Sequence, residues 1–393
     1  MRNSKIINTV ELLTTIKDAE KIMNTQSENV KRVLIADIEM AKKAINRLLF
    51  GFEKVNIDDT HWESIVSKCL MQRADANNSY DEQFFIVRDV IKYVPSESIF
   101  NTCKSNYLNL DSEKKDIVTK YYQCYHNFWG TLKPDEDNYQ AIWDKVSSVK
   151  EHIEEFEWLY NKLADYRSKY VLINYLKYCI SFDSNCVQKM RENNFPDYWD
   201  LDLLPRMSDE IIVDLGGYNG DTIIQYVDSY GEDSYKAIYS FEMSPYNVLK
   251  MRERLRGLKN VHIVPKAVGS KEGTVCLQFI DGVHSCNSLY ADYKNYASYT
   301  EKTEVEITTV DSEINDRITL IKMDVEGAEQ EALKGCKRHI TEEHPKLLIC
   351  VYHNNEDVWK VPSMIHSMDE SYQFYLRSNG DQVGPSEIVL FAL

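Results

Sequence analysis

One short segment, residues 210–222, constrains the fold more than any other part of the chain. Its sequence is EIIVDLGGYNGDT, in which an apolar run and an acid, Asp214, precede a turn that contains Gly216, Gly217 and Gly220. An apolar, helix-compatible run follows the turn. A buried strand, a tight turn and a helix in this order form the first unit of a doubly wound α/β sheet. The glycines let the backbone bend sharply and approach a ligand closely.

The spacing of the turn indicates which ligand it accepts. The nicotinamide fingerprint G-x-G-x-x-G is absent, and the order is Asp214-x-Gly216-x-x-x-Gly220. A carboxylate ahead of the turn repels a pyrophosphate but suits a ligand that carries an ammonium, a sulfonium and a ribose. The sequence therefore favours S-adenosylmethionine over a nicotinamide cofactor, which argues against a dehydrogenase.

Further strands are predicted to end on polar residues. Glu242, Asp324 and His353 follow the apolar runs at residues 237–241, 318–323 and 346–352, and a shorter strand is predicted at 261–264. Ligands of open α/β sheets bind at the carboxyl ends of the strands. We therefore expect Asp214 and these three residues to lie near one another.

These segments carry a family resemblance. The runs VDLGGYNGDT, SFEMSPYN, PKAVGSKEGTV, TTVDSEI, LIKMDVEGAEQEALKG, YQFYLR and EIVLFAL resemble the FkbM-type methyltransferases over roughly residues 155–393, and IKMDVEGAE is the most specific. The resemblance implies the Rossmann-like fold of class I methyltransferases, with S-adenosylmethionine as methyl donor and S-adenosylhomocysteine as product. The family commonly methylates hydroxyls of sugars, glycans and polyketides.

The predicted cofactor site combines the glycine turn with later strand ends. An acid that ends the second strand grips ribose hydroxyls in such folds, which assigns this role to Glu242. Thr222 begins a helix, where it either caps the helix or faces the cofactor carboxylate. Tyr218 stands where the general class I pattern has a third glycine. The predicted cofactor-binding residues are Asp214, Gly216, Gly217, Tyr218, Gly220, Thr222, Glu242, Met243, Ala267, Val268, Tyr198 and Asp324.

An aromatic and acidic loop, residues 194–200, precedes the first strand. It resembles a segment that related enzymes carry upstream of their cofactor turn. Two interpretations are open. Tyr198, Trp199 and Asp200 can close over the methionine end of the cofactor, or the aromatic side chains can pack on the sheet as a fixed lid.

Methyl transfer from a sulfonium is an in-line displacement, so alignment of donor and acceptor supplies much of the catalysis. A hydroxyl acceptor also benefits from a positioned base. The predicted catalytic residues are Asp324, His353, Glu326 and His284. Each has a structural alternative, which is a helix cap for the acids and a core position for the histidines.

No metal is predicted. Asp311, Asp316 and Asp324 show no spacing that fixes a cage of oxygen ligands. The 9 cysteines include no C-x-x-C pair, and Cys276 and Cys286 lack partners at zinc spacing, so we expect reduced thiols.

The chain is divided into three predicted parts. Residues 1–150 form a helical N-terminal domain for oligomerisation, acceptor binding or simple stabilisation. Residues 151–206 form a helical connector and lid, and residues 207–393 form the methyltransferase domain. Helix starts are predicted at Ser27, Thr60, Ser79, Ser148 and Asp165, and a further helix near 116–128.

Composition limits the partners. A formal net charge of −16 argues against a nucleic-acid substrate, which requires a basic face. The first residues lack an apolar signal region, and no run of about 18 apolar residues exists, so we expect a cytoplasmic protein without a membrane span.

Three functions stay open. The leading hypothesis is O-methylation of a sugar hydroxyl in glycan or polysaccharide biosynthesis. The second is N-methylation of an amino sugar or small amine. The third is a non-catalytic partner protein that retains the cofactor pocket.

Overall fold

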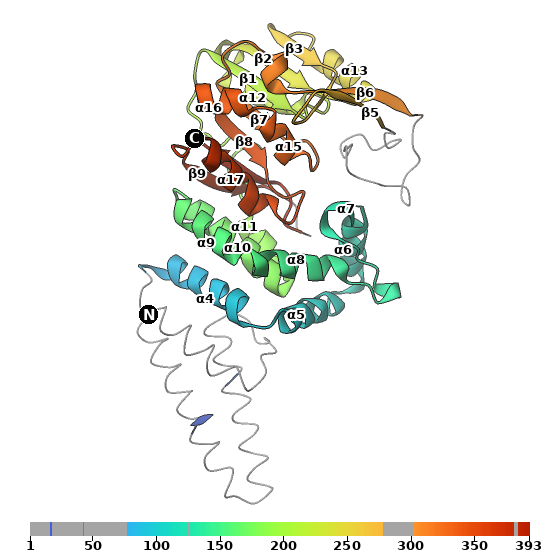
Figure 1. The fold of residues 1–393 in the computed structure, drawn as a ribbon, viewed down its shortest axis with the longest axis vertical. Helices are drawn as coiled ribbons and strands as arrows, with labels where there is room; N and C mark the ends of the chain where they lie inside the picture. The colour runs from blue at the N-terminus through green and yellow to red at the C-terminus, as the bar shows by residue number, and fades with distance from the viewer. Residues whose placement is uncertain (1–15, 18–41, 43–76, 125, 278–301, 381–383) are drawn as a thin grey trace, which may run out of the picture.

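The chain consists of an α/β part and a helical part (Figure 1). Two helices that the sequence predicts to begin at Ser27 and Thr60 lie outside the described residues. The computed structural model describes residues 16, 17, 42, 77–124, 126–277, 302–380 and 384–393.

A seven-stranded sheet with the order β3-β2-β1-β7-β8-β10-β9 forms the centre of the α/β part. β1, β2, β3, β7 and β8 are parallel, and β10 runs antiparallel to both of its neighbours. The strand order reverses at β1, which places a crevice at the carboxyl ends of β1 and β7. The strands are β1 Glu210–Leu215, β2 Tyr235–Phe241, β3 Val261–Val264, β7 Leu320–Met323, β8 Lys346–Cys350, β9 Phe374–Ser378 and β10 Ile388–Ala392.

Helices connect the parallel strands and make the fold a doubly wound, Rossmann-like α/β structure, as the sequence predicts. A second, small sheet has the order β4-β6-β5, with β4 at Ala267–Val268, β5 at Gly273–Leu277 and β6 at Thr303–Thr308. The helices of this part are α12 Asp221–Tyr230, η2 Glu232–Ser234, α13 Pro245–Arg254, α14 Val310–Glu313, α15 Glu329–Lys334, α16 Lys337–Glu343 and α17 Asp357–Met368.

The predicted strands of the large sheet are confirmed with small shifts. β7 begins two residues later than predicted and β8 ends two residues earlier. Asp214 lies inside β1 rather than after it, because the parallel ladder with β2 and β7 continues to Leu215.

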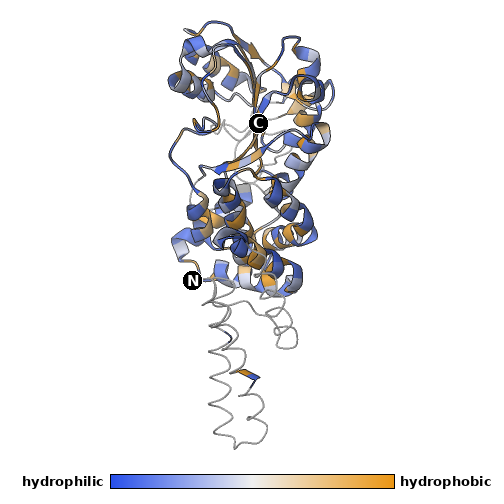
Figure 2. Cartoon of the chain, turned by 90° about the vertical axis from the view of Figure 1, so that its left-hand side faces the viewer, coloured by the Kyte–Doolittle hydropathy of each residue, from blue (hydrophilic) through white to orange (hydrophobic). Residues whose placement is uncertain are grey.

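The helical part lies below the sheet in Figure 1. Figure 2 shows that hydrophobic residues gather in its interior and that polar residues face outward. Its elements are α4 Ser79–Tyr93, α5 Ser96–Leu108, α6 Ser112–Cys124, α7 His126–Trp129, η1 Pro134–Glu136, α8 Gln140–Glu151, α9 Ile153–Lys162, α10 Tyr166–Ser181 and α11 Ser184–Met190.

Helix caps test the predicted starts. Asp165 caps α10, and its Oδ1 accepts a hydrogen bond from Ser168 N at 2.7 Å. The start at Ser79 is one residue late as a cap, because Asn78 Oδ1 accepts the bonds from the first turn of α4. The start at Ser148 is wrong, because Ser148 lies inside α8. That helix ends at Glu151, and the next helix, α9, begins at Ile153 after His152.

The two parts share one hydrophobic core. A single buried cluster extends from Phe84 of α4 through Leu172 of α10 to Leu376 of β9. The backbone continues the contact, since Leu163 pairs with Phe374 as an isolated parallel bridge. The predicted boundary at residues 150 and 151 falls at the end of α8, and the division into domains stays a prediction.

Gly216 gives a test of the turn that follows β1. Its φ is +78°, and a Cβ atom would overlap the backbone carbonyl oxygen of Asp324. We expect Gly216→Ala to lower the free energy of unfolding by more than about 2 kcal/mol, because left-handed strain adds to a backbone clash. Gly257→Ala is the control, since a Cβ there meets nothing within 4 Å. Urea unfolding of both variants measures the difference. Equal midpoints would contradict the conclusion that the turn requires glycine at position 216.

Candidate active site

A cavity of about 380 Å³ lies at the carboxyl ends of β1, β2 and β7. It is therefore at the point of the sheet where the strand order reverses. Nine of the predicted cofactor residues line it: Tyr198, Gly216, Tyr218, Thr222, Glu242, Met243, Ala267, Val268 and Asp324. Of the predicted catalytic residues, Asp324 and Glu326 line it as well.

The other three predicted cofactor residues shape the turn and do not line this cavity. Gly217 N donates to Phe241 O at 2.8 Å and Gly220 N donates to Gly217 O at 2.8 Å, so both glycines close the turn. The Asp214 side chain is buried, and its Oδ2 accepts a hydrogen bond from Ser240 Oγ at 2.8 Å. Direct contact between Asp214 and a ligand stays a prediction.

Lys322, which the sequence reasoning missed, pairs with Asp214 from the neighbouring strand β7. Its Nζ lies 3.2 Å from Asp214 Oδ1 and donates to Gly216 O at 2.8 Å. Burial works to lower the pKa of Lys322, but Asp214 and Asp324 raise it overall. A lysine inside the apolar run that precedes Asp324 was the sequence signal for a buried charge.

Glu242 follows β2 and has a buried side chain at the cavity wall. Its Oε1 accepts a hydrogen bond from Ser244 N at 2.6 Å. Burial raises the pKa of Glu242 to about 7, although the bonds from Ser244 and Asn247 oppose the shift. A hydroxyl donor that entered the cavity would stabilise the ionised form.

The side chains of the aromatic loop have different surroundings, and closure over a cofactor stays a prediction. Tyr198 lines the cavity, and its hydroxyl donates to Asp324 Oδ2 at 2.7 Å. Trp199 packs in the core and donates from Nε1 to Thr222 O at 3.2 Å. Asp200 Oδ2 accepts from Arg377 Nε at 2.7 Å, which ties the loop to β9.

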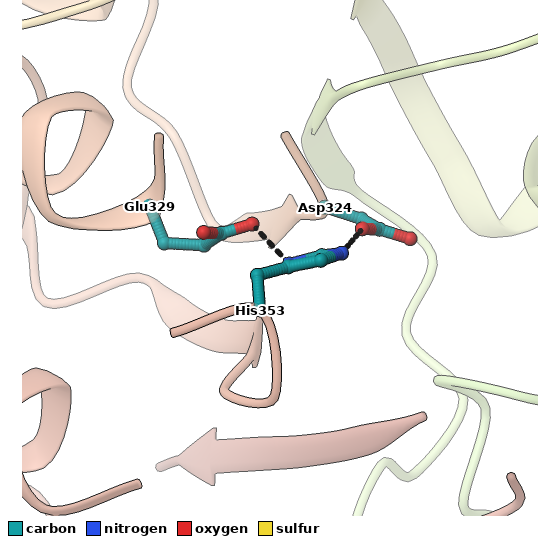
Figure 3. A group of neighbouring side chains, drawn as sticks. All are labelled: Asp324, Glu329 and His353. Atoms are coloured by element: carbon teal, nitrogen blue, oxygen red, sulfur yellow. Dashed lines mark ion pairs between the residues drawn. The ribbon is translucent and has the colours of Figure 1, made fainter. Parts of the chain in front are cut away.

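The imidazole of His353 lies between the carboxylates of Asp324 and Glu329 (Figure 3). The figure shows Glu329 and Asp324 at opposite nitrogens of the buried His353 ring. His353 Nδ1 lies 2.9 Å from Glu329 Oε1, and Nε2 lies 3.7 Å from Asp324 Oδ1 and 3.4 Å from Glu326 Oε2. His353 itself is not among the residues that line the cavity.

The charges of this group act on one another. Burial works to lower the pKa of His353, but Glu329 and Glu326 raise it well above its usual range. Burial works to raise the pKa of Asp324, but Lys322 and His353 lower it overall. Burial raises the pKa of Glu326. A neutral His353 that takes a proton directly from an acceptor therefore finds little support in this geometry, and that role stays a prediction.

Several other residues that line the cavity were not predicted from the sequence, because the segments that they contact are distant in the chain. Glu387 precedes β10, and its Oε1 accepts a hydrogen bond from Tyr352 OH at 3.2 Å. Burial and Asp324 raise the pKa of Glu387 to about 8. Asp197, Asp221, Gln225, Asn247 and Lys266 complete the polar lining. His284 lies outside the described residues.

The helical part contacts the strand ends next to the cavity. A Cβ atom at Gly327, where φ is +93°, would overlap the ring of Phe128 from α7. Trp129 Nε1 donates to Tyr352 O at 3.2 Å, and Lys145 Nζ donates to Asn355 Oδ1 at 2.8 Å. Helices far from the sheet in sequence therefore support the turn that carries Glu326.

Comparison with known sequence families decides the class of this site. The family described as the methyltransferase FkbM domain matches residues 214–383, a range that includes the glycine turn, β2 and β7. The chain carries an FkbM-type methyltransferase domain. This family belongs to the S-adenosylmethionine-dependent methyltransferases as a class. Comparison with curated proteins gave no match.

One solved structure supports the fold. A crystal structure of methyltransferase FkbM from Methylobacillus flagellatus KT is similar with a TM-score of 0.54 and 21% identity, and the match covers 65% of each chain. This chain thus spans just under two thirds of that structure. More distant matches include an rRNA methylase from Streptococcus thermophilus (TM-score 0.30, 14% identity, 47% of this chain and 87% of that chain). Another is the fibrillarin of Aeropyrum pernix with bound S-adenosyl-L-methionine (TM-score 0.30, 13% identity, 48% and 69%).

The described helices were also compared with the requirements of a membrane span. Within those parts of the chain, no helix is both long enough and apolar enough to cross a bilayer.

The Lys322–Asp214 pair gives a stability test beneath the cavity. We expect Lys322→Met to lower the free energy of unfolding by about 3–5 kcal/mol, because Asp214 is left as an uncompensated buried charge. The added change Asp214→Asn should recover part of this loss. Lys360→Met is the control, since it removes a half-exposed pair with Glu356 and should cost less than about 1 kcal/mol. Chemical denaturation measures all three, and a loss no larger than the control would refute the pairing.

Proposed function

We propose that the cavity binds S-adenosylmethionine and that the enzyme transfers its methyl group to a hydroxyl of a sugar in glycan or polysaccharide biosynthesis. The observation that carries the proposal is the cavity at the switch point, with Glu242 at the end of β2 and Asp324 at the end of β7. The spacing of these groups around one cavity suits a ligand with a ribose and a charged sulfonium.

The donor is proposed to lie along the glycine turn. Glu242 accepts hydrogen bonds from the ribose hydroxyls. The N-terminus of α12, with Thr222, faces the carboxylate of the donor, because helix N-termini favour negative groups. Asp324 stabilises the sulfonium, and Tyr198 holds Asp324 through the hydrogen bond described above. This arrangement would leave the methyl group directed toward the end of the cavity formed by Glu326, Tyr352 and Glu387.

The acceptor is proposed to bind at that acidic end. Transfer then depends mainly on in-line alignment of the acceptor oxygen with the methyl group and the sulfur. Of the predicted bases, Glu326 and Asp324 line the cavity, whereas His353 lies behind them. Since Asp324 is committed to the donor and to Tyr198, we assign the acceptor proton to Glu326, with His353 as its positioning group.

The nature of the acceptor atom separates two candidate reactions. A carboxylate base and a polar wall suit a hydroxyl, and these features support O-methylation. An amine acceptor would also find carboxylate partners at Glu326 and Glu387, so N-methylation of an amino sugar is the alternative. Transfer of labelled methyl from S-adenosylmethionine to a panel of neutral sugars and amino sugars, followed by mass spectrometry, tests the proposal. Labelled O-methyl product supports it, and N-methyl product alone would replace it.

The helical part is proposed to complete the acceptor side. The packing of Phe128 against Gly327 and the bond from Trp129 to Tyr352 support this role over assembly alone. Self-association through the helices and a cytoplasmic location stay predictions from the sequence.

Donor binding gives a pH test that needs no acceptor. The pKa of Glu242 is about 7 in the empty cavity, and ribose hydroxyls prefer the ionised form. Binding therefore releases a proton, and affinity for S-adenosylhomocysteine should rise about tenfold between pH 6 and pH 8. Glu242→Gln should weaken binding about tenfold or more at pH 8 and remove the pH dependence. Calorimetry checks both, and a pH-independent affinity of the parent would contradict the ribose role.

The base assignment gives a second test. Once an acceptor is found, Glu326→Gln should lower turnover by a factor on the order of 10²–10⁴ while S-adenosylhomocysteine affinity changes little. Glu342→Gln serves as the matched control, since Glu342 is exposed on α16. If Glu326→Gln keeps turnover within threefold of the parent, alignment alone or Asp324 carries the step.

A further inference from the structure

Two neighbouring residues of the aromatic loop are bonded to opposite parts of the cavity wall. The hydroxyl of Tyr198 donates to Asp324 Oδ2 at the end of β7, at 2.7 Å. Trp199 Nε1 donates to the carbonyl oxygen of Thr222 in the first turn of α12, at 3.2 Å. Asp324 and Thr222 both line the cavity. The position of the loop therefore affects the wall on two sides.

The next residue of the loop, Asp200, is held by a buried arginine on β9. Asp200 Oδ2 accepts a hydrogen bond from Arg377 Nε at 2.7 Å, and the two side chains are only 6% and 5% exposed. Arg377 Nη2 donates to Asp165 Oδ2 at 2.7 Å, and Nη1 donates to Ser168 Oγ at 2.9 Å. One guanidinium thus joins the loop to the edge strand β9 and to the N-terminus of α10.

The loop backbone is also tied to itself on either side of this ion pair. Trp199 N donates to Pro196 O at 3.1 Å, and Leu204 N donates to Asp200 O at 2.9 Å. Tyr198 is 7% exposed and has a φ of +67°. A left-handed conformation at a non-glycine residue persists only where the surroundings enforce it. All of these bonds are made by the chain itself.

We propose that Arg377 is a positioning residue for the cavity and that the aromatic loop is a fixed wall rather than a lid that closes. Arg377 holds Asp200, and Tyr198, two residues earlier, holds the carboxylate of Asp324. A wall that is fixed before a ligand enters lowers the entropic cost of binding. The effect on the donor rests on the proposed function, in which Asp324 stabilises the sulfonium, whereas the fixed loop does not.

Hydrogen exchange of the full chain, followed by mass spectrometry, tests the fixed loop. Peptides that cover residues 197–204 should be protected in the parent alone, and S-adenosylmethionine should change their exchange rates by less than about twofold. Arg377→Lys should raise these rates about tenfold or more, because a compact ammonium cannot replace a guanidinium that spans Asp165 and Asp200. Protection that develops only after S-adenosylmethionine is added would show a closing lid and overturn the proposal.

Arg338→Lys is the matched control for the loss of a guanidinium. Arg338 Nη2 donates to two backbone carbonyl oxygens, of Asp311 and Ile314, and Arg338 does not line the cavity. Exchange in residues 197–204 should equal that of the parent in this variant. Equal rates in Arg377→Lys and Arg338→Lys would show that Arg377 does not hold the loop.

A double-mutant cycle tests whether Arg377 acts through Tyr198. Tyr198→Phe, which removes only the hydroxyl, should weaken binding of S-adenosylmethionine about tenfold. It should weaken binding of S-adenosylhomocysteine less, because that product lacks the sulfonium. The double variant with Arg377→Lys should bind S-adenosylmethionine within about twofold of the weaker single variant. A general loss of structure would instead multiply the two effects, and that result would overturn the positioning role.

Two outcomes separate this inference from the proposed function. If Arg377→Lys does not fold, Tyr198→Phe alone decides, since parental affinity for S-adenosylmethionine in that variant would overturn the role of the loop in the cavity. A parent that binds no S-adenosylmethionine overturns the proposed donor and the effect of Tyr198 on it. The exchange rates of residues 197–204 still decide whether Arg377 fixes the loop.

Discussion

The buried ion pair between Lys322 and Asp214 is the interaction on which the rest of the site depends. It joins the two strands, β1 and β7, that flank the switch point of the sheet, and both partners are 2–3% exposed. The same ammonium binds Gly216 O and thereby fixes the first residue of the glycine turn. The position of the cavity wall thus follows from one compensated charge. Buried pairs add little net stability but are costly to break, so this pair serves mainly to specify the turn.

Residues whose roles are local could be predicted from the sequence. The strand before Gly216, the turn itself and Glu242 at the end of β2 all follow from apolar runs, glycine spacing and the rule for strand ends. Asp165 as a helix cap is equally local. Start signals were weaker where a neighbour competes, which is why Asn78 rather than Ser79 caps α4.

Residues whose roles depend on distant partners could not be predicted in this way. Lys322 is a single charged residue in an apolar strand, and its role becomes clear only from its pairing with Asp214 on the neighbouring strand. The sequence around Glu329 is typical of a surface acid on a helix. In the structure its side chain is fully buried against His353, which follows a different strand. Phe128 packs against Gly327, but no pattern in the sequence links these two residues. The sequence therefore predicts the side of the cavity formed by the glycine turn better than the side formed by Glu326, Tyr352 and Glu387, which come from separate segments of the chain.

Strained backbone conformations are concentrated at the cavity. Eight non-glycine residues of the described chain have positive φ, and four of them, Tyr198, Tyr218, Glu326 and Glu387, line the cavity. Such conformations cost on the order of 1–3 kcal/mol each and persist only where the surroundings enforce them. For Glu326 the enforcing contacts include Phe128 on Gly327 and the ion pair with His353. A fold has no structural need to place this much strain around one cavity, so a ligand is the simplest reason for this arrangement.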